Sequence, residues 1–430
     1  MELAAAARSL ETGSPKMLSR RILLISLSTT ALIGALAGRT GSGFAADKTI
    51  KIGINLPFTG ADAHDAELIK DGAMLAIDEA NAAGGVGGYK IEVLQLDDGT
   101  ATAGQYDPAQ AATNARKMVS DDSVVAAIGP QMSGSGKAMS PILSQGGLAT
   151  ITPSSTNPDI TNPKFAAQYR PSGKAIYFRT VTTDAFQGPN MANYFADTLK
   201  VKSVYVLDDS GAYGVGLADA FEAQAKKRGI NVLGRDQLNP KEADYTTTLT
   251  KIKALNPDSL YYGGVAQAGV KVVKQSYDIL PDIIKSGGDG VYGAEILKGV
   301  GFPAAQGWYA TTASPNMVEN PDAAPVIERF VKKYGTQPDN YSITAYDAAL
   351  VILDAIKTIA ASGKDVTRDA MRDAIQQSHA KTLQGEVSFD ANGDIENRVV
   401  SVFRITRNDK YPLDDILHQY KYLGVAPASS

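Results

Sequence analysis

The sequence predicts an α/β protein with two lobes, each built around an open parallel sheet. Short segments rich in β-branched residues alternate with longer segments of helical periodicity, a pattern typical of parallel strands joined by helices. This alternation begins at residue 49, continues to residue 152 and restarts near residue 203. The length of 430 residues also suits two or three domains rather than one.

The first lobe opens with a predicted strand over residues 49–56, which is β-branched and closed by Pro57. A helix is predicted over residues 66–80, because apolar side chains recur there with a period of 3.6 residues and Gly84-Gly85 ends the pattern. The alternation then predicts strands over 91–96, 124–128 and 148–152 and helices over 108–120 and 137–145.

The second lobe repeats the same unit. Strands are predicted over 203–207, 231–236, 259–262 and 283–285, and helices over 215–228, 245–254 and 269–279. Two rounds of one supersecondary pattern indicate two similar α/β lobes.

The last third departs from this alternation. It contains predicted helices over 324–334, 343–361 and 368–378 with predicted strands over 308–311, 385–390 and 398–406. Because these helices lack a sheet of their own, we expect them to return and cover the first lobe. The chain would then cross between lobes three times, forming a three-segment hinge. The expected boundaries are 47–179 plus 311–390 for the N-terminal lobe and 180–310 plus 391–430 for the C-terminal lobe.

The N-terminus has the pattern of an export signal. Residues 22–38 are uncharged and mostly apolar, Arg20 and Arg21 precede them, and the small residues of 43–46 (GFAA) suit cleavage. The alternative is a membrane span, but the apolar run falls slightly short of the roughly 20 residues that a span needs. We therefore expect residues 1–46 to be a signal peptide with an N-terminal extension, and the mature protein to be periplasmic.

Composition excludes several kinds of site. The chain has no cysteine, which removes disulfides, thiolate metal sites and cysteine nucleophiles together. Its three histidines are isolated from one another, so a metal site would need oxygen ligands almost throughout. The formal net charge is −4 and no strongly basic segment is visible, which disfavours nucleic acid as a partner. We expect no metal and no cofactor.

Two glycine-rich segments resemble phosphate-binding loops only superficially. Residues 84–88 (GGVGG) follow a helix and lead into a strand, whereas a dinucleotide loop runs from strand to helix. Residues 134–137 (GSGK) lack the earlier glycine of a P-loop, and Ala138 supplies no hydroxyl for magnesium. No G-x-S-x-G elbow is present either. We therefore expect a binding protein rather than an enzyme.

Hydroxyl-rich loops follow two neighbouring strands of the predicted first sheet. Residues 128–136 (IGPQMSGSG) follow the third strand, and residues 152–158 (TPSSTNP) follow the fourth. Ligands of open α/β sheets bind beyond the carboxyl ends of the strands, and free amides at a helix start favour an anion. Each loop alone is consistent with ordinary helix capping. Together at adjacent strand ends, they predict a site for a carboxylate.

The order and spacing of these segments resemble the branched-chain-amino-acid-type periplasmic substrate-binding proteins of ABC importers, the type I, LivJ-like class. The resemblance covers about residues 48–425 and implies two Rossmann-like lobes. It rests on Ile52-Gly53, Thr59-Gly60, Gly72-Ala73, residues 76–81 (AIDEAN), Gly84-Gly85, residues 128–130 (IGP), Ser133, residues 152–156 (TPSST), Tyr213-Gly214, residues 261–264 (YYGG) and residues 288–290 (GDG).

The resemblance implies site residues position by position. Ser133 matches the hydroxyl that holds the ligand carboxylate, and Thr156 matches a threonine that binds it through backbone and hydroxyl. Ser154 falls where a backbone carbonyl receives the ligand ammonium. Asp289 occupies the acidic position that pairs with that ammonium, and Tyr213 matches a tyrosine that closes from the second lobe.

The wall of the side-chain pocket differs from the usual pattern. Tyr341 falls where an aromatic wall is expected, but a common aromatic residue is replaced near Asp65, with His64 beside it. Val265 stands where amino-acid binders of this class often have tyrosine. Asp65 and His64 either face a polar or basic end of the ligand or lie in a solvated loop. Asp289 in its glycine turn has a purely structural alternative as well.

The resemblance implies a solute receptor that delivers a small amino acid or related carboxylate to a membrane permease, acting as a monomer. Three alternatives remain open at this point. They are a binder of aromatic or aliphatic carboxylic acids or amides, a sensory ligand-binding module, and a secreted α/β hydrolase. An acid without an amine would not need Asp289, which distinguishes the first alternative.

Overall fold

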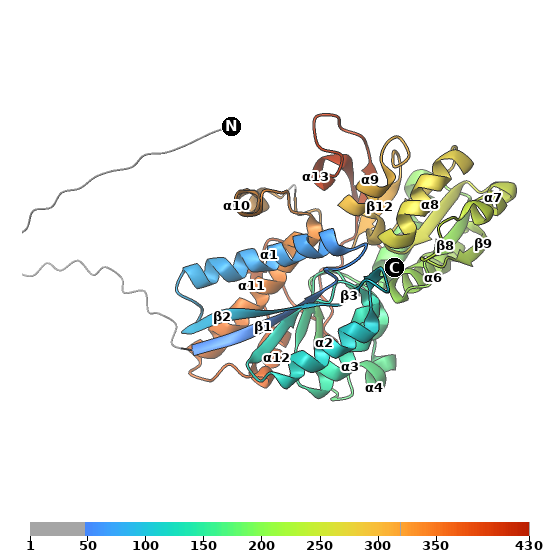
Figure 1. Ribbon diagram of the computed structural model, residues 1–430. Helices are drawn as coiled ribbons and strands as arrows, with labels where there is room; N and C mark the ends of the chain where they lie inside the picture. The colour runs from blue at the N-terminus through green and yellow to red at the C-terminus, as the bar shows by residue number, and fades with distance from the viewer. Residues whose placement is uncertain (1–47, 319, 430) are drawn as a thin grey trace, which may run out of the picture. The chain divides into compact units, whose positions relative to one another are not determined.

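The computed structural model describes residues 48–318 and 320–429, in which two large sheets alternate with helices (Figure 1). The expected signal peptide over residues 1–46 lies outside the described residues. None of the helices in the described part of the chain combines the length and apolar character needed to cross a membrane.

The first sheet has five strands, all parallel, in the order β2-β1-β5-β6-β7. The β-branched side chains of Ile52 and Ile54 are fully buried on the interior strand β1, which is why this segment is a strand. The strands are β1 (Lys48–Leu56), β2 (Tyr89–Asp97), β5 (Val124–Ile128), β6 (Thr150–Thr152) and β7 (Tyr177–Arg179). A small separate pair is formed by β3 (Gly99–Thr100) and β4 (Gln105–Tyr106).

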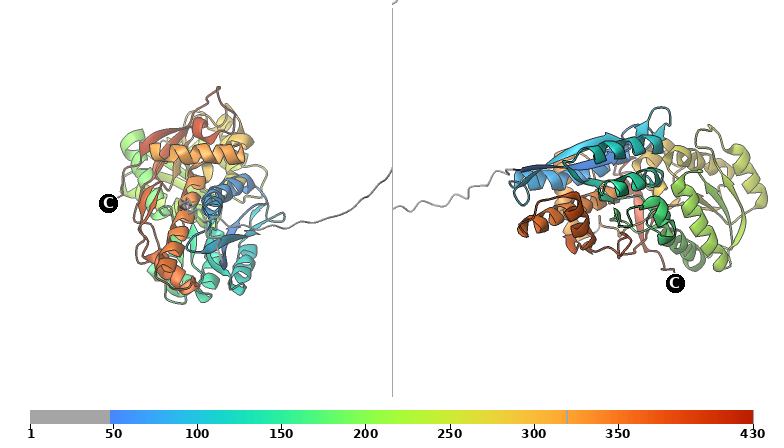
Figure 2. Two further views of the ribbon diagram at one scale, coloured as in Figure 1. Left: turned by 90° about the vertical axis from the view of Figure 1, so that its left-hand side faces the viewer. Right: turned by 90° about the horizontal axis from the view of Figure 1, so that it is seen from below.

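Two helix pairs flank this sheet, one on each side (Figure 1). The long helix α1 packs against α11, which comes from the last third of the chain, and α2 packs against α3. The expected return of the late helices to the first lobe is therefore seen in the structure (Figure 2). The bounds are α1 (Ala63–Ala82), α2 (Pro108–Ser120), α3 (Ser133–Gln145), α4 (Ala166–Tyr169), α10 (Ala324–Tyr334), α11 (Asn340–Ala361) and α12 (Arg368–Gln376).

The second sheet has seven strands in the order β16-β15-β12-β11-β10-β8-β9. Alternate residues of β8 enter two different cores: Val204 and Val206 face α5 and α6, while Tyr205 and Leu207 face α7 and α8. The strands are β8 (Ser203–Asp208), β9 (Asn231–Gln237), β10 (Ser259–Gly263), β11 (Ile284–Gly287), β12 (Tyr309–Thr312), β15 (Ser401–Ile405) and β16 (Tyr420–Val425). The helices are α5 (Asp184–Tyr194), α6 (Ala212–Lys227), α7 (Thr246–Leu255), α8 (Ala266–Ile279), α9 (Ala294–Val300) and α13 (Ile416–Gln419).

This second sheet is not wholly parallel, which corrects the prediction. β12 pairs with β15 in antiparallel fashion, with Thr312 opposite Ser401, and β15 pairs likewise with β16. The reason lies in the chain path: β12 runs out of the sheet toward the first lobe, so the strand that returns from that lobe must run the opposite way. The expected lobe boundary at residue 311 falls inside β12, which belongs entirely to this sheet.

The strand expected over 385–390 is also different. It is the short strand β14 (Gly385–Val387), which forms a two-stranded hairpin with β13 (Ala380–Thr382) outside both large sheets.

The chain passes between the two sheets three times, after β7, after β12 and before β15. These connections are tied to one another by hydrogen bonds. The Thr182 amide donates to the Ala313 carbonyl at 2.7 Å, and the Ser401 hydroxyl donates to the Ser314 carbonyl at 2.8 Å. All three crossings therefore lie side by side.

The packing of α1 against α11 depends on a glycine. A Cβ atom at Gly72 would lie 1.9 Å from the Ser342 carbonyl oxygen. We expect Gly72→Ala to lower the free energy of unfolding by about 1–3 kcal/mol, because the two helix backbones would have to separate. Urea denaturation measures this loss. Glu67→Ala, at an exposed position on the same helix, should change it by less than about 0.5 kcal/mol, and equal effects would contradict the close approach.

Candidate functional site

A cavity of about 50 Å³ lies where strand-end loops and helix starts of the two lobes meet. Every predicted site residue except Thr156 lines it. Sequence reasoning missed several further lining residues on the loops and helix starts around it. The lining residues are Asp62, Asp65, Gln131, Met132, Ser133, Ser154, Tyr213, Val265, Ala266, Asp289, Gly290, Tyr292 and Tyr341.

Helix α3 begins at Ser133 and directs its first turn toward the cavity. This start is four residues earlier than the predicted helix over 137–145. The first intrahelical bond in this turn runs from the Gly136 amide to the Met132 carbonyl at 2.9 Å, so the amides before Gly136 have no partner within the helix. Such amides, together with the helix dipole, favour an anion.

The Ser133 hydroxyl is oriented by its own partners. Its oxygen accepts hydrogen bonds from the Asn157 amide at 3.1 Å and from the Ser155 hydroxyl at 3.3 Å. Because a hydroxyl has two acceptor positions and one proton, the Ser133 proton is left available to donate. This end of the cavity thus offers several donors and suits a carboxylate.

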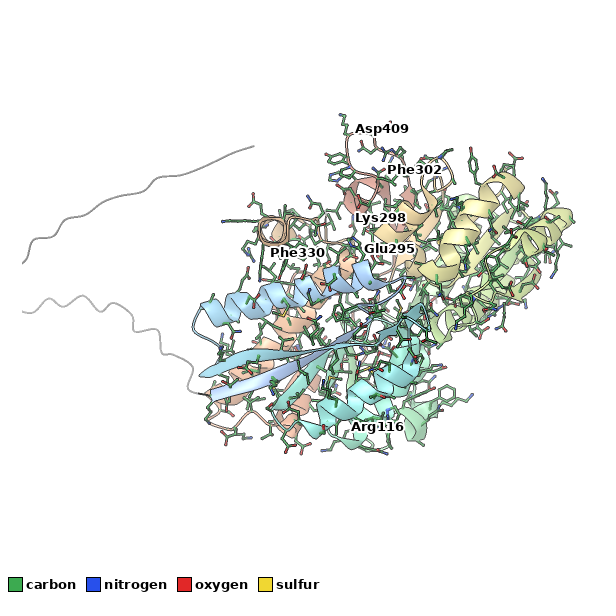
Figure 3. The ribbon with its side chains drawn as sticks, viewed as in Figure 1. Arg116, Glu295, Lys298, Phe302, Phe330 and Asp409 are labelled. Atoms are coloured by element: carbon green, nitrogen blue, oxygen red, sulfur yellow. The ribbon has the colours of Figure 1, made fainter. Side chains whose placement is uncertain are left out.

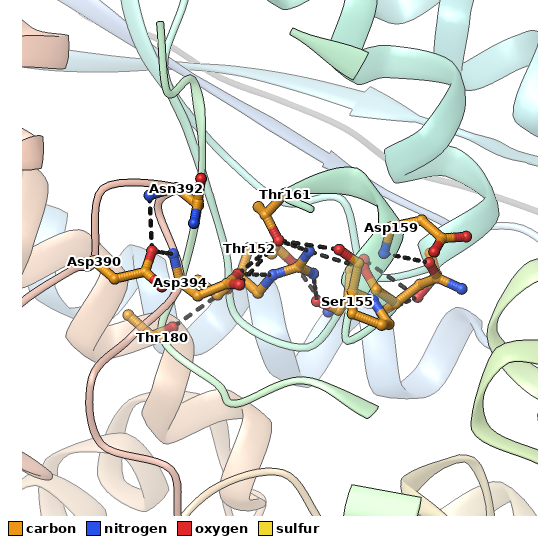
Figure 4. A network of polar contacts seen from close by, with 12 residues as sticks. Thr152, Ser155, Asp159, Thr161, Thr180, Asp390, Asn392 and Asp394 are labelled. Carbon is orange, nitrogen blue, oxygen red and sulfur yellow. Dashed lines mark hydrogen bonds and ion pairs between the residues drawn. The ribbon is translucent and has the colours of Figure 1, made fainter. Parts of the chain in front are cut away.

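Arg179 holds the second hydroxyl-rich loop in place, and Figure 4 labels its partners Ser155, Thr161 and Asp394. Its guanidinium is fully buried and donates to the Ser155 carbonyl at 2.5 Å, the Asn157 carbonyl at 2.8 Å and the Thr161 hydroxyl at 3.1 Å. An ion pair with Asp394, at 2.7 Å, balances its charge. The sequence carried no signal for this role, because Arg179 simply ends a strand and the acid that balances its charge lies 215 residues away.

The same loop presents Ser154 to the cavity, whereas Thr156 lies behind it. Ser154 donates its hydroxyl to the Gln131 carbonyl at 3.1 Å. Thr156 is fully buried, and its carbonyl accepts from the Asp184 amide at 2.9 Å. Thr156 is therefore not among the lining residues, and its role toward the ligand stays a prediction.

Asp289 lies on the second lobe and presents its carboxylate to the cavity, with only 8% of the residue exposed. The phenol of Tyr341 donates to it at 2.6 Å, the phenol of Tyr213 donates to its other oxygen, and the Gln187 amide donates at 3.2 Å. Burial raises the pKa of Asp289, while these three donors favour its charged form. A charged carboxylate at this position suits a cationic group of a ligand.

A second buried acid stands behind Asp289. Gln187 bridges the two carboxylates, since its amide also donates to Asp184 at 3.3 Å. Burial and the nearby charge of Asp289 raise the pKa of Asp184 well above its ordinary value. The phenol donors that reach Asp289 thus favour charge on Asp289 over charge on Asp184. Gln187 was not predicted either, although it lies one turn into α5, a helix that the sequence reading left out.

Acidic groups of the first lobe line the cavity as well. Burial raises the pKa of Asp62 to about 7, and burial raises that of Asp65 well above its ordinary value. Neither carboxylate forms an ion pair with a basic side chain among the described residues. No lining residue is basic. In the described part of the chain, no group of three or more acidic or histidine side chains is placed to hold a metal ion.

Comparisons with known proteins identify the family. The family model described as "Periplasmic binding protein" matches residues 49–410. The chain belongs to the periplasmic binding protein family. A Leu/Ile/Val-binding protein of Rhizobium johnstonii is 31% identical over 356 residues, covering 83% of this chain and 91% of that relative.

Other periplasmic binding proteins are similar along most of the chain. A leucine-, isoleucine-, valine-, threonine- and alanine-binding protein of Pseudomonas aeruginosa is 30% identical over 370 residues, covering 86% of this chain and 93% of that relative. The LivJ substrate-binding protein of Streptococcus pneumoniae, solved with isoleucine, is 25% identical with a TM-score of 0.73, covering 88% of this chain and all of that one. As a periplasmic binding protein, the chain binds a solute and is not an enzyme.

Arg179 provides a test of how the loop is held. We expect Arg179→Met to lower the free energy of unfolding by about 3 kcal/mol, because it leaves Asp394 and two loop carbonyls without their buried partner. Chemical denaturation measures this change. Arg116→Met, at an exposed position on α2 that Figure 3 labels, is the matched control and should have little effect. Similar losses in both variants would show that the loop does not depend on Arg179.

The buried acids predict how stability changes with pH. The pKa is raised to about 7 in Asp62 and Asp347 and to about 6 in Asp98 and Asp209. The folded state therefore binds more protons than the unfolded state between about pH 4 and pH 7, and stability falls as pH rises through that window. We expect the Tm of the ligand-free protein to drop by at least about 5 °C from pH 5 to pH 8.

Differential scanning calorimetry in matched buffers measures this drop. Asp62→Asn should make the dependence on pH shallower, because an amide cannot titrate. A Tm that rises over this range would mean that these acids are charged in the folded protein.

Proposed function

We propose that this protein is the extracytoplasmic receptor of an ABC importer and captures an amino acid between its two lobes. The observation that supports it most is that one cavity places the donor-rich start of α3 and the Asp289 carboxylate together. A zwitterion has two full charges, and removing water from both is costly unless each finds a matching group. Ser133 and the α3 amides match the carboxylate, and Asp289 matches the ammonium.

The lobe contacts support a closing mechanism. Asn157 of the first lobe donates to the Ala212 carbonyl of the second at 2.7 Å, and Gln267 of the second donates to the Ala103 carbonyl of the first at 3.2 Å. A ligand that contacts both lobes favours the conformation in which both contacts exist. The three side-by-side crossings serve as the hinge, with lobes of residues 47–179 plus 313–390 and residues 180–312 plus 391–430.

The remaining parts of the proposal concern the context of the protein. Residues 1–46 direct export to the periplasm, where the mature chain acts as a monomer and delivers its ligand to a membrane permease. The names of the relatives support an amino acid as that ligand, since they are amino-acid-binding proteins. An amine-free carboxylic acid is disfavoured because it would leave Asp289 facing the ligand without a cation.

The role of Asp289 can be tested by asking whether the ligand must carry an ammonium group. We expect ligand-free protein, prepared by unfolding and refolding, to be stabilised in thermal-shift assays by amino acids and not by the matching 2-oxo acids. A ligand at 100 times its Kd adds roughly 2.7 kcal/mol, which is easily detected. Asp289→Asn should weaken binding by at least about tenfold, since it removes the charge that pairs with the ammonium.

Two further variants make the test specific. Ser133→Ala should weaken binding from the carboxylate end, while Asp278→Asn, at an exposed position on α8, should bind as the unaltered protein does. Stabilisation by 2-oxo acids to the same extent as by amino acids would contradict the role of Asp289. A lack of response to every amino acid and acid would contradict the proposed ligand class.

A further inference from the structure

The part of the cavity wall that comes from the first lobe contains acceptor atoms that lack donors. Asp62 and Gln131 are 3% and 9% exposed, and both line the cavity together with Asp65. Within the described residues, the buried oxygens Asp62 Oδ2, Asp65 Oδ1 and Gln131 Oε1 have no hydrogen-bond partner. A buried acceptor without a donor lowers the stability of the folded state. A ligand that donates hydrogen bonds to these three oxygens would remove that cost.

The local structure of α1 makes this arrangement unusual. Asp62 stands at the N-cap of α1, where aspartate commonly accepts hydrogen bonds from the first amides of the helix. Here its side chain makes no capping hydrogen bond and lines the cavity instead. Asp65 follows in the first turn of the helix. The carboxylate of Asp62 therefore does not cap the helix.

The surroundings of these two carboxylates are acidic. Asp98, Asp209 and Glu295 face Asp62, and Asp339 and Glu295 face Asp65. The basic group near Asp65 is Lys298, on the α9 helix that contacts α1 (Figure 3), and it forms an ion pair with Asp414 at 3.1 Å. Neither Asp62 nor Asp65 has an ion-pair partner within the described ranges. In the described part of the chain, these two acids thus have no basic partner that would stabilise their ionised form.

We propose that Asp62, Asp65 and Gln131 form a subsite for a cationic nitrogen group on the side chain of the ligand, so that the ligand is a basic amino acid. This inference rests on the proposed function, because Asp289 is then occupied by the α-ammonium. An ammonium has three donors and a guanidinium five, so either group has enough donors for the three unpartnered acceptors. Val265 and Ala266, which line the same cavity, supply apolar surface for the methylene groups in between.

The raised pKa of Asp62, about 7, fits this role. In the empty cavity the protonated form avoids an unpaired buried charge, and a cationic ligand would stabilise the ionised form. Binding of a cation is therefore expected to release protons near neutral pH, whereas a neutral side chain would leave the protonated acids unchanged.

The test compares basic amino acids with neutral counterparts of nearly the same shape. Isothermal titration calorimetry on the refolded, ligand-free full chain would measure arginine against citrulline and lysine against norleucine. We expect at least one basic amino acid to bind at least about tenfold more tightly than its neutral counterpart. Titration in buffers of different ionisation enthalpy should show proton release for the basic member of that pair only.

Variants test whether Asp62 and Asp65 cause the preference for basic amino acids. Asp62→Asn and Asp65→Asn should each weaken binding of the basic amino acid by at least about tenfold and leave binding of norleucine unchanged or tighter. Glu67→Gln removes the same charge from an exposed position on the same helix, where Glu67 contacts Lys70, and should change neither. If Asp62→Asn fails to fold by circular dichroism, Asp65→Asn carries the test.

The outcomes separate this inference from the proposed function. Equal affinity for arginine and citrulline and for lysine and norleucine, or binding of neutral amino acids alone, overturns the subsite and leaves amino-acid capture standing. Loss of the preference in Glu67→Gln as well overturns the assignment to Asp62 and Asp65. The absence of binding to any amino acid overturns the proposed function and the subsite together.

Discussion

The buried carboxylate of Asp289 is the constraint around which the two lobes are arranged. A buried charge is tolerated only when donors or an opposite charge surround it, and those donors come from both lobes. Tyr213 and Gln187 reach it from α6 and α5 of the second lobe, and Tyr341 reaches it from α11 of the first. The helices of the last third must therefore return to the first lobe to complete the environment of a residue on the second.

A similar demand explains how the donor end of the cavity, at the start of α3, is built. The loop that follows β6 has no regular structure to hold it, so its carbonyl groups need donors from elsewhere. Arg179 supplies them to Ser155 and Asn157, and Asp394 balances its charge (Figure 4). Asn157 in turn donates to the Ser133 hydroxyl, which leaves the serine proton free. The donor end of the cavity thus depends on a buried ion pair outside it.

Most of the fold could be predicted from the sequence, because the alternation of apolar strands and helices is a local pattern. The helix over 108–120 and the strand over 124–128 have the bounds that were predicted. What the sequence could not provide depends on distant partners. The antiparallel direction of β15 follows from the path of the chain between lobes. The burial of Arg179 depends on an ion pair with Asp394, 215 residues further along the chain.

The site residues also separate into those that the sequence could place and those that it could not. Asp289 and Ser133 could be placed by resemblance because they stand in recognisable turns and strand ends. Asp62 could not be placed in the site from the sequence, because an aspartate before a helix is ordinarily explained as its cap. Only the absence of its capping hydrogen bond in the structure points to a role in the cavity. Together with Asp65 and Asp289 it gives the cavity three carboxylates and no basic side chain. The α-ammonium pairs with Asp289 alone, so the unpartnered oxygens of Asp62 and Asp65 favour a ligand that carries a second cation.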